Sequence, residues 1–290
     1  MIFEGFEPRT IAAEGTEIFC RVGGKGPPLL LLHGCPQTHM MWHKVVPELT
    51  RHFTVIAPDL RGYGRSAKPQ GSPTHDNYSF RAMARDQVLV MLELGFKRFS
   101  AIGHDRGARV LHRMCLDHPA AVDKVAFLDI LPTSYLYSQT NMQFATQYWE
   151  WFFFTQKGDF PETVLSAAPE AFLRYELGHL LDDGVIDTAV WDEYLNALSS
   201  YDAMQGMCED YRAGATIDLL HDSSNADTKM GADLLLLWGK RNPIWERFAM
   251  VDVWHDYAER VEGHSIDSGH YLAEEAPTEI LSSVIPFLKA

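Results

Sequence analysis

Short apolar runs, each ended by a glycine, an aspartate or a proline, recur along this 290-residue chain and constrain its fold more than any other feature. Uniformly apolar runs of four to seven residues are typical of parallel strands buried on both faces between helices. A pair of strands joined by a turn at Glu14-Gly15 is expected over 9–22. Further strands are predicted at 28–34, 53–59, 99–105, 122–130, 233–239 and 260–266.

Amphipathic segments between these runs predict the helices that cover the sheet. They span 80–94, 107–118, 247–259 and 277–288, the last with a proline at its N-terminal end. Alternating strands and helices predict an α/β fold with a mostly parallel, doubly wound sheet. The segment 132–229 interrupts this alternation, is rich in aromatic residues and is predicted to be helical. We expect a core of residues 1–131 and 230–290, with 132–229 inserted as a helical cap over the carboxyl edge of the sheet, where such sheets bind ligands.

The formal net charge of −14 argues against nucleic acid or an anionic membrane as a partner, since both need a basic face. An anionic substrate would therefore need a local cluster of arginine or lysine. The first ten residues have no apolar signal-peptide core, and the four cysteines have no paired spacing, so a cytoplasmic location is expected. His39 and His43 lack the glutamate of a zinc-binding HExxH motif, and no metal or organic cofactor is expected.

The segment Gly103-His-Asp-Arg-Gly107 lies directly between a predicted strand and a predicted helix. Its glycine spacing is that of the nucleophile elbow, Gly-x-Ser-x-Gly, of the α/β-hydrolase fold, with Asp105 in the place of serine. The glycines relieve crowding at a strained turn, which lifts the central side chain into the substrate pocket. An ordinary aspartate N-cap is the alternative interpretation. The elbow spacing predicts that Asp105 is the nucleophile of an enzyme.

Two other segments fit the same fold in the expected order. His33-Gly34-Cys35-Pro36 follows an earlier strand, where this fold draws one oxyanion-hole amide. The backbone amides of Cys35 and Arg106 are therefore predicted to share one developing negative oxygen. The run 59–66 (Asp-Leu-Arg-Gly-Tyr-Gly-Arg-Ser) is a recurrent, structural signature of the fold.

His270 is the predicted catalytic histidine among the thirteen in the chain. It lies in a turn after the last predicted strand, in the chain order nucleophile, acid, histidine that this fold uses. Many members place the acid a few residues beyond the strand that here ends at Gly239, but that position holds an amide, Asn242. The other known place is the end of the preceding strand, where Asp129 lies. We therefore predict Asp129 as the acid, with Asp233 and Asp267 as weaker alternatives.

A carboxylate nucleophile is already anionic, so the histidine is free for a second step. Asp105 is expected to attack an sp³ carbon and form an ester, which water activated by His270 then hydrolyses. Carbon–halogen bonds and epoxides are suitable electrophiles. Arg106 and Arg109 lie near the start of the elbow helix and are predicted to bind a substrate carboxylate.

The chain resembles the fluoroacetate (haloacetate) dehalogenases over nearly its whole length. The resemblance is carried by 104–109 (His-Asp-Arg-Gly-Ala-Arg), 128–130, Trp151, the run 210–218 and Gly269-His270. It implies hydrolysis of a haloacetate to glycolate and halide, with the carboxylate held by Arg106 and Arg109. It also implies that Trp151 and Tyr211 donate hydrogen bonds to the halide, and that the protein is a homodimer.

Glu150 departs from that family, which has histidine before this tryptophan. An ionised carboxylate beside a departing anion repels it, and fluoride depends most on strong donors. We therefore include Glu150 in the halide pocket and expect chloride and bromide to be preferred over fluoride. The alternative is that Glu150 turns away to pair with an arginine of the cap.

Two other functions fit parts of the sequence. An epoxide hydrolase would share Asp105 and use cap tyrosines, such as Tyr148, Tyr175 or Tyr211, to protonate the opening oxygen. Such enzymes usually have tryptophan directly after the nucleophile, where this chain has Arg106. A non-catalytic ligand-binding member of the fold would normally lack part of the triad.

Overall fold

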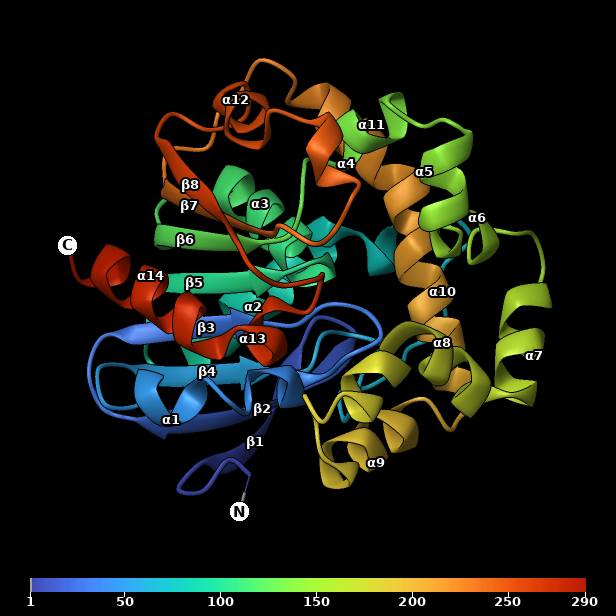
Figure 1. Cartoon of the computed structure of the whole chain (residues 1–290), viewed down its shortest axis with the longest axis horizontal. Coiled ribbons are helices and arrows are strands. Elements are labelled where there is room, and N and C mark those ends of the chain that lie inside the picture. Colours follow the sequence, from blue (N-terminus) through green and yellow to red (C-terminus); the bar gives the residue numbers. More distant parts are fainter. Residues whose placement is uncertain (1) are drawn as a thin grey trace.

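An eight-stranded sheet forms the centre of the computed structural model, which describes residues 2–290 (Figure 1). The strand order is β1-β2-β4-β3-β5-β6-β7-β8. The pairs β1–β2 and β2–β4 are antiparallel and all others are parallel, which confirms the predicted mostly parallel sheet. The strands are β1 (Glu7–Ala13), β2 (Thr16–Gly24), β3 (Pro28–Leu32), β4 (Thr54–Pro58), β5 (Phe99–His104), β6 (Val122–Leu128), β7 (Asp233–Gly239) and β8 (Val261–Ile266).

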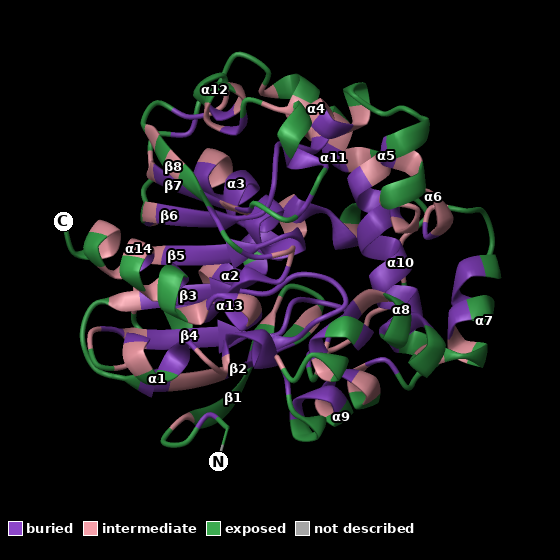
Figure 2. Ribbon diagram, in the orientation of Figure 1, coloured by how far each residue is buried: buried purple, intermediate pink, exposed green. Residues whose placement is uncertain are grey.

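Helices cover both faces of this sheet, so its central strands are buried as their apolar sequences predict (Figure 2). In Figure 1, α2 and α3 lie behind the sheet, and α1 and α14 lie in front of it. The helices of the core are α1 (Val46–Leu49), α2 (Phe80–Glu93), α3 (Arg106–Asp117), α12 (Met250–His255), α13 (Leu272–Glu275) and α14 (Pro277–Lys289), with 3₁₀ turns η1 (His39–Trp42), η2 (Asp76–Tyr78) and η3 (Trp245–Arg247).

The predicted helix over 247–259 is wrong in its extent. The turn η3 ends before Phe248, whose backbone is extended (φ −125°, ψ 138°), and only Met250–His255 is α-helical. Near the other end of the segment, Ala258 pairs with Met230 in an isolated β-bridge. The helix therefore begins later and ends earlier than the amphipathic pattern predicts.

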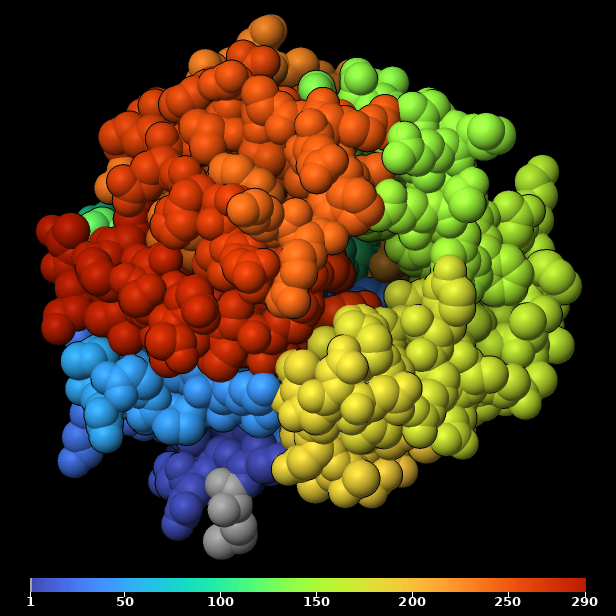
Figure 3. Space-filling model, viewed as in Figure 1, coloured from blue at the N-terminus to red at the C-terminus, as the bar shows by residue number. Residues whose placement is uncertain are grey.

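Eight helices of the described chain lie between β6 and β7, beside the carboxyl ends of the parallel strands (Figure 1). They fall within the segment 132–229, whose boundaries as a cap domain stay a prediction. Figure 3 shows a hollow where this segment meets the C-terminal part of the core. None of the helices in residues 2–290 is long and apolar enough to span a membrane. The eight helices are α4 (Thr133–Ser138), α5 (Met142–Gln147), α6 (Glu150–Phe153), α7 (Phe160–Ala167), α8 (Pro169–Asp182), α9 (Thr188–Ala197), α10 (Tyr201–Ala215) and α11 (Ile217–Ser224).

Candidate active site

The turn between β5 and α3 has the strained geometry expected of a nucleophile elbow. Asp105 lies at its apex with φ +45°, a conformation that residues other than glycine rarely adopt. The flanking glycines are sterically required. A Cβ on Gly107 would lie 2.3 Å from the carbonyl oxygen of Leu32, and one on Gly103 would lie 2.7 Å from Cα of Ala108. The turn therefore points the Asp105 side chain away from the strand and toward the cap.

The carboxyl group of Asp105 is buried but not isolated. Its Oδ1 accepts a hydrogen bond from the backbone N–H of Cys35 over 3.2 Å. The side chain of Asp105 makes no capping hydrogen bond to the backbone of α3, so the alternative that Asp105 is an ordinary N-cap is wrong. Burial alone would raise the pKa of Asp105, but the positive charges of His270 and Arg109 outweigh burial and lower it. Asp105 is therefore ionised at neutral pH.

His270 follows β8 and reaches Asp129, which follows β6. Its Nδ1 lies 2.5 Å from Oδ2 of Asp129. Although burial opposes the charged form, the hydrogen bond and charge of Asp129 raise the pKa of His270 to about 9. The two alternative acids lie elsewhere, because Asp233 pairs with Arg260 and Asp267 lies beside Arg241.

Asp129 is held by more donors than the sequence indicates. Its Oδ1 accepts from the backbone N–H of Gly239 and from the indole N–H of Trp245, both over 2.7 Å. Its Oδ2 also accepts from the side-chain amide of Asn242 over 3.2 Å. A carboxylate with this many donors is fixed in orientation, so it can hold the ring of His270.

His104, a residue that sequence reasoning missed, supports His270 from the elbow. Burial lowers the pKa of His104 to about 3, so its ring is neutral. Its Nε2 donates to the backbone carbonyl of His270 over 2.8 Å, and the two ring centroids are 4.6 Å apart. The residue directly before the nucleophile therefore positions the backbone of the histidine that acts beside it.

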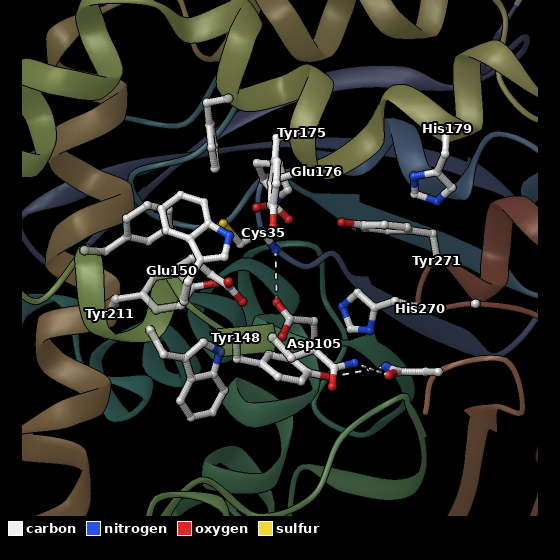
Figure 4. A pocket seen from close by; sticks show the side chains of 18 of the residues that line it. Cys35, Asp105, Tyr148, Glu150, Tyr175, Glu176, His179, Tyr211, His270 and Tyr271 are labelled. Carbon is white, nitrogen blue, oxygen red and sulfur yellow. Dashed lines mark hydrogen bonds between the residues drawn. The ribbon is translucent and has the colours of Figure 1, made fainter. Parts of the chain in front are cut away.

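A cavity of about 260 Å³ lies between the core and the cap, with Asp105 and His270 in its wall (Figure 4). Trp151 and Tyr211 of the predicted halide pocket also line it, with ring centroids 6.5 Å apart. Other lining residues from the core are Cys35, Pro36, Arg241, Asn242, Gly269 and Tyr271, and those from the cap are Gln147, Tyr148, Trp149, Glu150, Phe154, Phe172, Tyr175, Glu176 and His179.

Glu150 points into this cavity rather than away from it (Figure 4). Among residues 2–290 no arginine pairs with it, so the alternative of an ion pair within the cap is wrong. Burial, and then the charge of Glu176, raise the pKa of Glu150 well above its ordinary value. The surroundings of the carboxyl that replaces the expected histidine therefore favour its protonated form.

Arg106 and Arg109, predicted to bind a substrate carboxylate, are not among the residues that line the cavity. Arg106 donates from Nε to Oδ2 of Asp210 over 2.9 Å, and its guanidinium stacks on the ring of Tyr211 at 4.3 Å. Arg109 donates to the carbonyl of Leu131 and the hydroxyl of Thr133, and lies 4.7 Å over Trp151. The two cations therefore stand behind the aromatic wall. Of the guanidinium nitrogens of Arg106 and Arg109, only Nε of Arg109 is buried without a hydrogen-bond partner.

Comparison with known proteins agrees with this geometry. A family model for the alpha/beta hydrolase fold matches residues 27–277. A fluoroacetate dehalogenase from Burkholderia sp. is 41% identical, with 99% of this chain and 95% of that protein aligned. A soluble epoxide hydrolase from Corynebacterium sp. (strain C12) is 29% identical, with 91% of each covered. The crystal structure of an alpha/beta hydrolase from Nostoc sp. PCC 7120 has a TM-score of 0.96 at 45% identity and covers 99% of each chain. The chain therefore belongs to the alpha/beta hydrolase fold family and, within it, to the family of the fluoroacetate dehalogenase.

Proposed function

We propose that this protein is a hydrolytic dehalogenase that cleaves the carbon–halogen bond of short 2-haloacids, turning a haloacetate into glycolate and halide. The observation that carries the proposal is an ionised Asp105 in the wall of a cavity beside the His270–Asp129 pair. The 41% identity to a fluoroacetate dehalogenase supports it.

The proposed reaction has two steps. An Asp105 oxygen attacks the carbon in line with the carbon–halogen bond, so an ester forms as the halide leaves. Water then attacks the carbonyl carbon of that ester while His270 accepts the proton. The N–H of Cys35, already 3.2 Å from Oδ1, and the N–H of Arg106 would stabilise the negative oxygen of this second step.

The departing halide would meet Trp151, Tyr211 and Glu150 on the cap side of the cavity. A neutral Glu150 carboxyl offers one donor, where the histidine expected from the family would offer a stronger one when charged. We therefore propose that chloroacetate and bromoacetate are better substrates than fluoroacetate.

Binding of the substrate carboxylate by Arg106 and Arg109 stays a prediction. It requires Arg106 to share its guanidinium between Asp210 and the substrate, because Asp210 already holds it. Arg109 is the stronger candidate, since its Nε has no partner and its charge already acts on Asp105.

Epoxide hydrolysis is the second candidate function. The similarity to a soluble epoxide hydrolase and the tyrosines that line the cavity favour it. An epoxide carries no carboxylate, so it would not need a free arginine in the cavity.

Halide release from chloro-, bromo- and fluoroacetate tests the proposal. Asp105→Asn should abolish release without unfolding the protein, since the change is nearly isosteric. His270→Ala should trap the ester on Asp105, which the intact mass and a peptide digest would reveal. Halide release by Asp105→Asn above a few per cent of the original rate, with deamidation excluded, would contradict the proposal.

A further inference from the structure

Two glutamates of the cap face the nucleophile across the cavity. Glu150 comes from α6 and Glu176 from α8, and both line the cavity that contains Asp105. Figure 4 shows both side chains reaching toward Asp105. Sequence reasoning placed Glu150 here through a family resemblance, but no motif marked Glu176. Three carboxyl groups therefore share one small space.

The three carboxyl groups differ in the charged groups that lie near them. Asp105 has the cations His270, Arg109 and Arg106 nearby. Among residues 2–290 no lysine or arginine forms an ion pair with Glu150 or Glu176, and Oε1 of Glu176 is buried without a hydrogen-bond partner. Since a buried carboxylate without a partner is costly, these two groups hold protons in place of counter-ions.

The surroundings of Glu176 also favour its protonated form. Burial raises the pKa of Glu176 to about 7, although the positive charge of His270 opposes the shift. An acid with a pKa near the working pH is the most effective proton donor. The ionisable groups that line the cavity with Glu176 are Tyr148 between α5 and α6, Glu150 from α6, Tyr211 from α10, Cys35 after β3, Asp105 from the elbow, Arg241 after β7, and His270 and Tyr271 after β8, with Tyr175 and His179 on its own helix.

The direction of attack by Asp105 determines which atom of the substrate lies next to the protons of Glu150 and Glu176. In-line displacement at carbon places the leaving atom on the side opposite to the nucleophile. Asp105 attacks from the core, so the leaving atom points toward the cap, where Glu150 and Glu176 lie. A halide leaves as a stable anion and needs hydrogen bonds but no proton. An alkoxide oxygen, in contrast, is a poor leaving group unless it is protonated as it departs.

We propose that Glu150 and Glu176 form a proton-donating pair that protonates the leaving atom, so that this site opens neutral epoxides as well as carbon–halogen bonds. The inference rests on the proposed attack by Asp105. In the step, an Asp105 oxygen bonds to an epoxide carbon, the carbon–oxygen bond breaks, and that oxygen takes the proton of Glu176. Water then attacks the carbonyl carbon of the hydroxyalkyl ester while His270 takes one of its protons and gives it to the alkoxide oxygen that leaves. The second proton of the water, left on the Asp105 carboxyl, passes to Glu176, which restores the enzyme with a vicinal diol as product.

The tyrosines of the cavity are weaker candidates for this proton. Burial raises the pKa of Tyr211, Tyr148 and Tyr271 well above 10, so each holds its proton tightly. The hydroxyl of Tyr211 is also hydrogen-bonded to the thiol of Cys35. The hydroxyl of Tyr148 accepts a hydrogen bond from the side-chain amide of Asn242. The carboxyl pair is the stronger acid on the cap side.

Single-turnover alkylation in a His270→Ala background tests the proposal, with bromoacetate and 1,2-epoxybutane as the two probes. Intact mass and a peptide digest would quantify the ester on Asp105 in each case, and His270→Ala/Asp105→Asn corrects for alkylation elsewhere. Adding Glu176→Gln keeps the shape but removes the acid. We expect the ratio of the epoxide rate to the bromoacetate rate to fall at least about 100-fold. Glu170→Gln, an exposed glutamate on the same helix, is the matched control and should leave the ratio unchanged.

The outcomes separate this inference from the proposed function. An ester from bromoacetate but none from the epoxide would overturn the inference and leave the dehalogenase standing. An ester from neither probe would overturn both. An epoxide ester that forms at an undiminished relative rate in Glu150→Gln/Glu176→Gln would mean that a tyrosine supplies the proton, and would overturn the role of the pair.

Discussion

Asn242 donates its side-chain amide to Oδ2 of Asp129, the same oxygen that accepts from Nδ1 of His270. Asn242 occupies the position at which many proteins of this fold carry the acid. Here Asn242 supports Asp129 instead, because an amide can donate a hydrogen bond to a carboxylate and a second carboxylate cannot. The amide nitrogen also lies 3.2 Å from the hydroxyl of Tyr148, so it links the acid to the cap.

Asn242→Asp is expected to lower kcat for haloacetate at least about tenfold, because two carboxyl groups at this distance cannot both stay ionised. One of them would hold a proton, and Asp129 would support the charged ring of His270 less well. Halide release across the pH range measures the effect. The exposed Asn196→Asp on α9 is the control. A kcat within twofold of the original for Asn242→Asp would show that the amide is dispensable.

Formation of the ester should release a proton from His270. The pKa of His270 is about 9 in the free enzyme, partly because Asp105 is negatively charged, so the ring is protonated at pH 7. Since the ester on Asp105 carries no charge, alkylation lowers the pKa of the ring and converts it to the neutral base that the second step needs.

A burst of up to one proton per site is therefore expected with bromoacetate in weakly buffered solution near pH 7, recorded with an indicator dye in stopped flow. The burst should shrink as the starting pH rises through about 9, where the ring is already neutral. His270→Ala should release halide once without the burst. A burst of equal size in that variant would mean that the proton comes from another group.

Glu150→His is expected to raise fluoride release more than bromide release. Expelling fluoride needs strong donors in the transition state, and a neutral carboxyl offers one. Each tenfold selective gain corresponds to about 1.4 kcal/mol of differential transition-state stabilisation. Values of kcat/KM for fluoro-, chloro- and bromoacetate in both enzymes provide the measurement. An unchanged fluoride-to-bromide ratio would place control of halide preference elsewhere in the cap.

Asp210→Ala is expected to lower the free energy of unfolding by about 3–5 kcal/mol, because it leaves the buried guanidinium of Arg106 without its counter-ion. Asp210 is fully buried and also accepts from the hydroxyl of Tyr63 over 2.7 Å. Urea unfolding measures the change. Asp202→Asn, at an exposed position of the same helix, should cost less than about 1 kcal/mol. A loss at Asp210 no larger than that of the control would contradict a structural role for the pair.

Local spacing was enough to predict the sheet, the elbow at Asp105, the pairing of His270 with Asp129 and the helical character of the inserted segment. Apart from the pairing of His270 with Asp129, these features depend on residues close in sequence: apolar runs favour buried strands, and only glycine fits at Gly103 and Gly107. The order of the strands in a doubly wound sheet then brings the ends of β5, β6 and β8 to one edge.

The surroundings of Arg106 and Glu176 were decided only by the tertiary structure. Arg106 lies beside Asp105 in sequence, yet it pairs with Asp210, 104 residues away. Glu176 carries no motif, and its place opposite the nucleophile follows from how α8 packs among the inserted helices. Spacing along the chain determines backbone geometry, whereas the side of a helix that meets the cavity, and so the charge that a substrate encounters, depends on packing between segments far apart in sequence.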